Sequence, residues 1–118
     1  LLSQDDLPYI YNALEIFVFP TYRKSESLGL VGLEAMACKT MVVASNKYGP
    51  SSYMVNEGNG FTFESGNEDS LYNSMLTAIK TDPIVKERIL SNARETAERY
   101  SSENTSYILL KLFKEILR

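Results

Sequence analysis

The stretch "ESLGLVGLEAMACKTMVVAS", residues 26–45, contains two elements that together decide the fold. Residues 28–38 are apolar or glycine at every position except Glu34, which predicts a buried helix that begins near Leu28. Met41 to Ser45 is a short, β-rich apolar run, as expected for a strand covered on both faces. The stretch therefore predicts a helix followed by a buried strand, with one carboxylate inside the helix.

One more strand is expected on each side of this unit. Ile16 to Phe19 is a continuous apolar run that Pro20 stops, which is the pattern of a parallel strand covered on both faces. After a turn region rich in Asn, Gly, Pro and Ser, residues 60–64 indicate a third short strand, with Phe61 and Phe63 on one side. The order strand, helix, strand indicates a βαβ unit.

The remaining segments are predicted to be helical, because apolar residues recur at helical spacing behind capping residues. Ser3 and Asp6 have the spacing of a capping box, Asn67 and "TDP" at 81–83 can start two further helices, and Ser101 or Ser102 can start the last. The apolar faces expected from these patterns are Leu7, Ile10 and Leu14; Leu71, Met75, Ala78 and Ile79; Val85, Ile89, Ala93 and Ala97; and Ile108, Leu109, Leu112, Phe113, Ile116 and Leu117. The last stripe is expected to pack on its own domain, with exposure or burial in a dimer as the alternatives.

Alternating strands and helices predict an α/β fold, a Rossmann-like parallel sheet with flanking helices. About three strands are visible, whereas a complete doubly wound sheet has roughly five or six. The chain also starts without methionine. We therefore expect residues 1–118 to be a single, truncated domain of a longer protein, with 101–118 as its terminal helix.

Composition excludes several classes of protein. The net charge is −3, from 12 basic and 15 acidic residues without a run of like charge, which disfavours nucleic-acid binding. The single cysteine, Cys38, sits in an apolar window, as expected for an inert thiol in a reducing compartment. No apolar run approaches the roughly 18 residues of a membrane span.

A ligand site is expected where the first two strands end. Ligands of parallel sheets bind at the carboxyl ends of the strands, which places the loops 21–28 and 45–52 on the functional rim. The first amides of the helix, from Leu28 to about Val31, would lack intrahelical acceptors, and Gly29 would let a ligand approach the backbone. Such a helix start suits a phosphate or diphosphate.

Two glutamates flank this helix start. Glu34 falls on the stripe of Leu30, Leu33 and Ala37, so its carboxylate is expected to face covered surface and to need hydrogen-bond donors. Sugar hydroxyls are suitable donors; pairing with a lysine or a backbone group is the structural alternative. Glu26 precedes the helix and can border the same cavity, or be a solvated charge beside Arg23 and Lys24.

The residues "FVFPTYRKSESLGLVGLEAMACKTMVVAS" (17–45) and "GPSSYMVNEGNGF" (49–61) resemble the donor-binding half of retaining GT-B glycosyltransferases, especially glycosyltransferase family 4 (group 1). The family motif of two glutamates separated by seven residues matches Glu26 and Glu34. The resemblance extends almost end to end.

The resemblance implies site roles. Glu26 would contact the donor sugar and act as the catalytic residue, and Glu34 would bind the ribose of the nucleotide. The amides of Ser27, Leu28, Gly29, Leu30 and Val31 would hold the diphosphate and nearby sugar hydroxyls. The resemblance also implies a UDP- or GDP-sugar as the donor substrate, no metal or other cofactor, a front-face reaction that retains configuration, and a separate N-terminal domain for the acceptor.

Location, partners and departures from the family complete the expectations. A cytoplasmic protein is implied, with association at the inner face of a membrane and dimerisation left open.

Lys39 stands where the family usually has glycine, Met41 where it has proline and Ser52 where it has glutamate. The family's basic pair for the diphosphate lies on upstream elements, so the chain alone is expected to be inactive. The alternatives are a non-catalytic nucleotide-sugar or partner-binding module, and a GT-B relative such as an epimerase or a phosphorylase.

Overall fold

A computed structural model describes residues 2–25 and 27–117 of the chain. Its three strands, β1 (Ile16–Phe19), β2 (Met41–Ser45) and β3 (Phe61–Phe63), form one parallel sheet in the order β1-β2-β3. In the register of the sheet, Val18 lies opposite Val43, and Val43 lies opposite Phe61. The predicted α/β class with a partial parallel sheet is confirmed.

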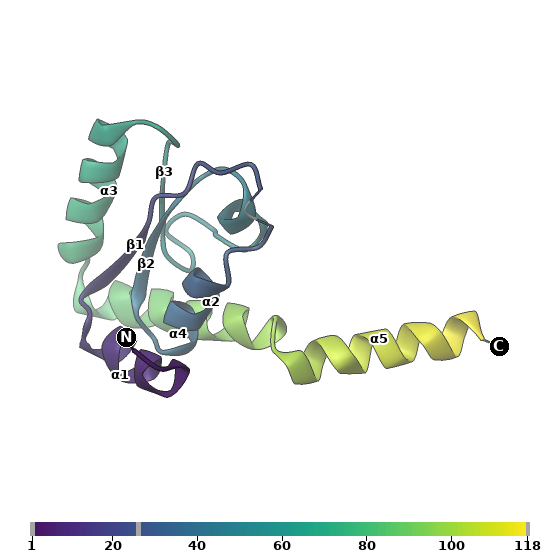
Figure 1. Ribbon diagram of the computed structural model, residues 1–118. Helices are drawn as coiled ribbons and strands as arrows, with labels where there is room; N and C mark the ends of the chain where they lie inside the picture. Colours follow the sequence, from purple (N-terminus) through teal and green to yellow (C-terminus); the bar gives the residue numbers. More distant parts are fainter. Residues whose placement is uncertain (1, 26, 118) are drawn as a thin grey trace.

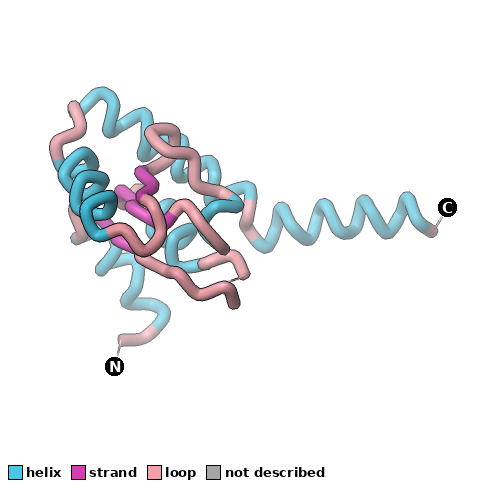
Figure 2. The backbone as a smooth tube through the Cα atoms, turned by 90° about the horizontal axis from the view of Figure 1, so that it is seen from above, coloured by secondary structure: helices cyan, strands magenta, loops and turns pink. Residues whose placement is uncertain are grey.

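Helices lie on both sides of the sheet, and the last helix leads away from it (Figure 2). In chain order they are η1 (Gln4–Asp6), α1 (Leu7–Ala13), α2 (Leu30–Ala37), η2 (Gly49–Ser52), α3 (Glu68–Ile79), α4 (Pro83–Arg99) and α5 (Ser102–Ile116), where η marks a 3₁₀ helix. Three predicted starts are confirmed, because Asn67, Asp82 and Ser101 each accept a hydrogen bond from the first turn that follows. The Asp6 carboxylate accepts from both the amide and the hydroxyl of Ser3, as in the predicted capping box.

The central strand β2 separates two apolar clusters. Val42 and Ala44 face the first cluster, which includes Tyr11, Phe17, Phe19, Leu33, Ala35, Met36, Tyr53 and Ala93. Met41 and Val43 face the second cluster, which includes Ile16, Val18, Phe61, Phe63, Leu71, Met75, Ala78, Ile89 and Leu90. Strand residues alternate between the clusters because successive side chains point to opposite faces of a sheet. Thus α1 and α2 cover one face, α3 covers the other, and α4 contributes to both (Figure 1).

The helix of the apolar window begins two residues later than predicted. It starts at Leu30, after Gly29 in a left-handed conformation with φ of 79°. A Cβ at Gly29 would lie 2.6 Å from Cε1 of Phe19, so only glycine fits this turn without strain. The chain uses Gly29 to turn sharply from the rim loop into α2, which leaves Leu28 outside the helix.

The two edge strands differ in exposure. The side chains of β1 pack against both clusters, as predicted, but all four residues are only half-buried because the strand lies at the edge, whereas β2 is fully buried. On β3, the outward amide of Thr62 donates to Oδ1 of Asn56, and its carbonyl accepts from Oγ of Ser74. Because side chains satisfy these groups, the β3 edge is blocked against further strand pairing at this residue.

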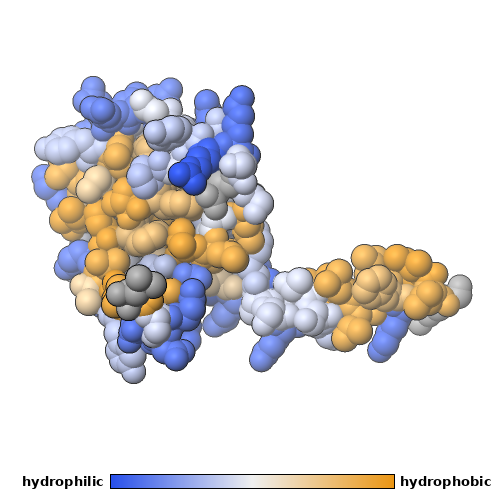
Figure 3. Space-filling view, in the orientation of Figure 1, coloured by the Kyte–Doolittle hydropathy of each residue, from blue (hydrophilic) through white to orange (hydrophobic). Residues whose placement is uncertain are grey.

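The prediction that the α5 stripe packs on its own domain was wrong. The helix extends away from the rest of the structure (Figure 1), and the later part of the face seen in Figure 3 is largely apolar. Leu109 and Leu112 are the least exposed large apolar residues on it, and both are still nearly half-exposed. Ile79 on α3 is likewise 60% exposed, so the predicted apolar face of α3 ends at Ala78. Periodicity identified the face of α5 but could not show whether any surface lies opposite it.

Lys39 follows the end of α2 with φ of 55°, a conformation that glycine adopts without strain. We expect Lys39→Gly to raise the free energy of unfolding by ~1 kcal/mol, measured by urea titration, because it removes the Cβ clash of the left-handed state. The lost ion pair to Glu87, at 3.6 Å between exposed side chains, contributes little. Lys39→Ala is the control, since it also loses the ion pair but keeps the Cβ. An equal gain in both variants would contradict this explanation.

Candidate functional site

The loops after β1 and β2 meet at the carboxyl end of the sheet, as predicted. Ser45, the last residue of β2, is fully buried, and its hydroxyl donates to the carbonyl of Thr21 at 2.7 Å. The carbonyl of Lys47 lies 3.3 Å from the same hydroxyl. This serine therefore joins the two rim loops beside the start of α2.

The first amides of α2 open toward this rim. Gly29 is buried, and its carbonyl accepts from the amide of Gly32 at 3.1 Å and from the hydroxyl of Tyr53 at 2.8 Å. Leu30 and Val31 follow with side chains that are 63% and 39% exposed. The amides of these two residues are the first of the helix, where intrahelical acceptors are missing and the dipole favours an anion. The first amides of the helix thus belong to Leu30 and Val31, the last two of the residues predicted to hold an anion.

Glu34 lies one turn beyond the helix start and is half-buried. Its Oε2 accepts a hydrogen bond from the hydroxyl of Tyr11 on α1, at 3.0 Å. The partner is therefore a tyrosine, and neither the lysine nor the backbone donor considered as the alternative. The expected covered stripe is only partly present, because Leu30 is exposed whereas Leu33 is buried. A ligand at the amides of Leu30 and Val31 can reach Glu34 along this exposed side of the helix.

Tyr11 is held firmly in place. It is 6% exposed, its ring packs edge-on against Phe17 with 5.5 Å between centroids, and its carbonyl accepts from the hydroxyl of Thr40 at 2.6 Å. Burial and the neighbouring Glu34 carboxylate raise the pKa of Tyr11 to about 12. The hydroxyl is consequently protonated at neutral pH and donates to Glu34, which fixes the orientation of that carboxylate.

A cavity of about 250 Å³ adjoins Glu34 between α1 and α2. Its lining is mainly apolar and consists of Gln4, Leu7, Pro8, Tyr11, Glu34, Ala37 and Cys38. Burial raises the pKa of the Cys38 thiol, which Arg94 opposes and Glu34 reinforces. A thiol with a raised pKa is a poor nucleophile, which agrees with the inert role predicted for this cysteine.

The other predicted site residues precede α2 in the chain. Glu26 lies outside the described residues. Ser27 is exposed and Leu28 is half-buried, both in a bend before Gly29, while Arg23 and Lys24 are exposed on the rim loop. The structure therefore brings together the helix amides, Glu34 and Tyr11.

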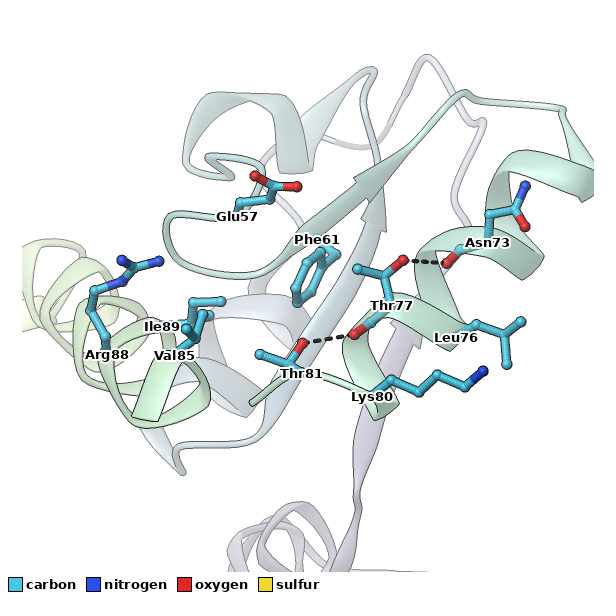
Figure 4. Close-up of a pocket in the computed structure, with 10 residues that line it drawn as sticks. All are labelled: Glu57, Phe61, Asn73, Leu76, Thr77, Lys80, Thr81, Val85, Arg88 and Ile89. Carbon is cyan, nitrogen blue, oxygen red and sulfur yellow. Dashed lines mark hydrogen bonds between the residues drawn. The ribbon is translucent and has the colours of Figure 1, made fainter. Parts of the chain in front are cut away.

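A larger cavity, of about 700 Å³, lies away from this rim, between β3, α3 and α4 (Figure 4). Phe61 forms part of its wall, and Thr77 and Thr81 donate their hydroxyl protons to carbonyls of the preceding helical turn. These hydroxyl protons are thus unavailable to a ligand. By volume alone this cavity would be the candidate ligand site. The polar groups available to a ligand favour the rim at α2 instead.

Sequence reasoning missed three residues around the candidate site: Ser45 and Tyr53 on the rim, and Tyr11 on α1. Tyr11 follows Leu7 by four positions, so helical periodicity could have placed it on the buried face of α1. Ser45 was assigned to the strand, but nothing in the sequence indicates its bond to Thr21. Tyr53 follows a turn region, and its contact with Gly29 spans 24 positions of the chain.

The fold is that of an α/β domain whose rim loops meet beside a helix start, and comparison with known proteins gives the family. The model of the family "Glycosyl transferases group 1" matches residues 1–96. The chain belongs to this family, which confirms the resemblance seen in the sequence.

Individual relatives of the chain are also named as glycosyltransferases. The chain is 31% identical over 116 residues to a D-inositol 3-phosphate glycosyltransferase of Streptomyces bingchenggensis, covering 98% of this chain and 25% of that protein. It is 34% identical over 94 residues to the capsular polysaccharide biosynthesis glycosyltransferase CapM of Staphylococcus aureus, covering 79% and 24%. The chain therefore spans about a quarter of the length of the curated relatives it matches.

Solved structures likewise match nearly all of this chain but only part of their own length. Sucrose-phosphate synthase from Thermosynechococcus elongatus superposes with a TM-score of 0.83 at 26% identity, over 98% of this chain and 29% of that one. Anabaena HepE in complex with UDP also gives a TM-score of 0.83 at 26% identity, over 95% and 30%. The fold is thus that of one part of a GT-B glycosyltransferase. Among the helices of the described residues, none is long and apolar enough to cross a membrane.

Replacing Tyr11 by phenylalanine tests the contact with Glu34. We expect Tyr11→Phe to lower the free energy of unfolding by about 1.5 kcal/mol at pH 7, because the buried ring stays and one hydrogen bond to a carboxylate is lost. Urea titration measures this difference. Tyr9→Phe is the matched control, since Tyr9 lies on the same helix and is 80% exposed. Equal losses in both variants would contradict a specific role for the bond.

The same tyrosine should produce a loss of stability in alkali. Its pKa is about 12 in the folded state and near 10 in the unfolded state, so the folded state holds the proton more tightly. The contribution of Tyr11 is complete below pH 10 and declines as the pH rises toward 12. Tyr11→Phe should therefore lose less stability than the unmodified chain over this interval. Parallel stability curves for the two proteins would contradict the raised pKa.

Proposed function

We propose that this chain is the donor-binding part of a retaining glycosyltransferase that transfers a sugar from a UDP- or GDP-sugar to a glycan, a lipid or a small acceptor. The observation that carries the proposal is the arrangement on α2: free amides at Leu30 and Val31, and the Glu34 carboxylate one turn further along the same helix. Four residues of helix span about 6 Å, a distance compatible with a diphosphate at the amides and a ribose at Glu34.

Glu34 suits the ribose role because its carboxylate retains acceptor capacity. An ionised carboxylate has about four acceptor positions, and the Tyr11 hydroxyl occupies one of them. The remaining positions can accept from the two vicinal hydroxyls of a ribose. The cavity of about 250 Å³ beside Glu34 provides room for part of such a ligand.

The relatives support a nucleotide-sugar as the ligand. HepE of Anabaena has been solved with UDP and with UDP-glucose, at 26% and 25% identity to this chain. We assign Glu26 to the donor sugar as the catalytic residue, and the amides of residues 27–31 to the diphosphate and nearby hydroxyls. In this scheme the helix amides and basic side chains neutralise the diphosphate without a metal, and the leaving phosphate helps to deprotonate the acceptor.

The proposal includes partners and location. The basic residues for the diphosphate and the acceptor site would lie in a preceding part of a longer protein, so the 118-residue chain alone would be inactive. We place that protein in the cytoplasm, with a role in polysaccharide biosynthesis at the inner face of the membrane. Binding of a panel of UDP- and GDP-sugars to the full-length protein, followed by product analysis, tests the assignment. Binding without turnover would favour a non-catalytic module, and a product other than a glycoside would favour an epimerase or a phosphorylase.

Removing the Glu34 carboxylate should weaken donor binding. We expect Glu34→Ala in the full-length protein to raise the dissociation constant of the nucleotide-sugar more than tenfold, since each hydrogen bond to a charged group contributes about 1.5–3 kcal/mol. Calorimetry measures the constant. Glu98→Ala is the control, because it removes an exposed carboxylate paired with Arg94 on α4. Unchanged binding in Glu34→Ala would exclude the ribose assignment.

The catalytic assignment predicts a different outcome for Glu26. Glu26→Gln should abolish most turnover while the affinity for the free nucleotide changes little, because the proposed contact is with the sugar. Rates under saturating donor, together with the dissociation constant of UDP or GDP, separate the two effects. Normal turnover in this variant would remove Glu26 from the site.

A further inference from the structure

We infer that Tyr53 is a positioning residue of the donor site, whose hydroxyl holds the Gly29 peptide so that the amides at the start of α2 face the diphosphate. This inference rests on the proposed function, since it names a residue that the diphosphate contact needs. Tyr53 itself lies behind the helix start and acts through the backbone of α2.

The contact is direct and buried. Tyr53 is 5% exposed, and its hydroxyl donates to the carbonyl of Gly29 at 2.8 Å. In a trans peptide, the carbonyl of one residue and the amide of the next point in opposite directions within one plane. Holding the Gly29 carbonyl against Tyr53 therefore turns the Leu30 amide to the opposite side, away from Tyr53. That amide is the first of the helix and belongs to the proposed anion site.

The surface of α2 is shaped to admit this hydroxyl. A Cβ at Gly32 would lie 2.3 Å from the Tyr53 hydroxyl oxygen and 3.3 Å from Cζ. Gly32 is inside a helix, where glycine is less favourable than alanine by ~1 kcal/mol. The close approach of Tyr53 gives a physical reason for glycine at this position.

Tyr53 also connects the two rim loops. It directly follows η2 on the loop after β2, while Gly29 ends the loop after β1. Its ring packs against Tyr100 with 6.1 Å between centroids, and its carbonyl accepts from Nδ2 of Asn59 at 2.7 Å. Because the tyrosine is fixed from several sides, its hydroxyl can hold the Gly29 peptide in one orientation.

The test compares UDP with uridine, which lacks the diphosphate, as ligands of the full-length protein. We expect Tyr53→Phe to raise the dissociation constant of UDP about fivefold and to leave that of uridine within about twofold, the size of effect expected for one lost hydrogen bond. The variant should fold, because the Gly29 carbonyl keeps the Gly32 amide as a partner. Tyr100→Phe is the matched control: it removes a hydroxyl 3.4 Å from the Ser52 carbonyl, behind the same ring, and should not change UDP binding.

A second variant examines the contact itself. Gly32→Ala should displace the Tyr53 hydroxyl and weaken UDP binding, although alanine favours the helix. In a Tyr53→Phe background the same substitution should have little further effect, because the hydroxyl is already absent. Such non-additivity is the signature of two changes acting on one contact.

The outcomes separate the inference from the function on which it rests. If the unmodified protein binds UDP and Tyr53→Phe binds it equally well, or loses UDP and uridine affinity alike, the positioning role is overturned. If the unmodified protein binds neither UDP nor GDP, the proposed function itself fails. Additive effects of Gly32→Ala and Tyr53→Phe would also overturn the role.

Discussion

The structure depends on the burial of β2 on both faces. All five of its residues, Met41 to Ser45, are buried, and successive side chains enter two different apolar clusters. A strand buried in this way needs a helical layer on each side, which α1 and α2 provide on one face and α3 on the other. The position of α4, which contributes Ile89 to one cluster and Ala93 to the other, follows from the same requirement. Ser45 extends this constraint to the rim, since its buried hydroxyl needs the carbonyl of Thr21 as a partner.

The proposed site is a consequence of how α2 is packed against this strand. The helix is apolar over most of its surface because it lies between the sheet and neighbouring helices, and this burial fixes the direction of its first amides. Gly29 allows the sharp entry, and Gly32 allows the close approach of Tyr53. The otherwise apolar helix α2 tolerates Glu34 because this residue stays half-exposed and has the Tyr11 hydroxyl as a donor. The elements that build the core therefore also orient the groups that we assign to the ligand.

Within the described residues, the edge strand β1 and the helix α5 are less covered than the rest of the fold. The β1 strand has apolar side chains that are only half-buried, and α5 extends from the body with large apolar residues exposed. Exposed apolar area of this kind is unusual on the surface of a monomeric soluble domain. The relatives matched by this chain are about four times as long. The core built around β2 is complete, in contrast, because both of its faces are covered within the described residues.

Sequence patterns alone determined the class of fold, the three strands, the helix starts at Asn67, Asp82 and Ser101, and the family resemblance around Glu34. These features depend on periodicity and capping within a few neighbouring residues, which is information that a short stretch carries. Patterns failed where the outcome depends on distant parts of the chain. The helix α2 starts at Leu30 because the Phe19 ring packs against Gly29, and α5 is exposed because, among the described residues, no element lies opposite its apolar face. The partner of Glu34 and the hydroxyl on the Gly29 carbonyl come from residues 23 and 24 positions away. Only the tertiary structure decides such contacts, because they exist only after the helices have packed on the sheet.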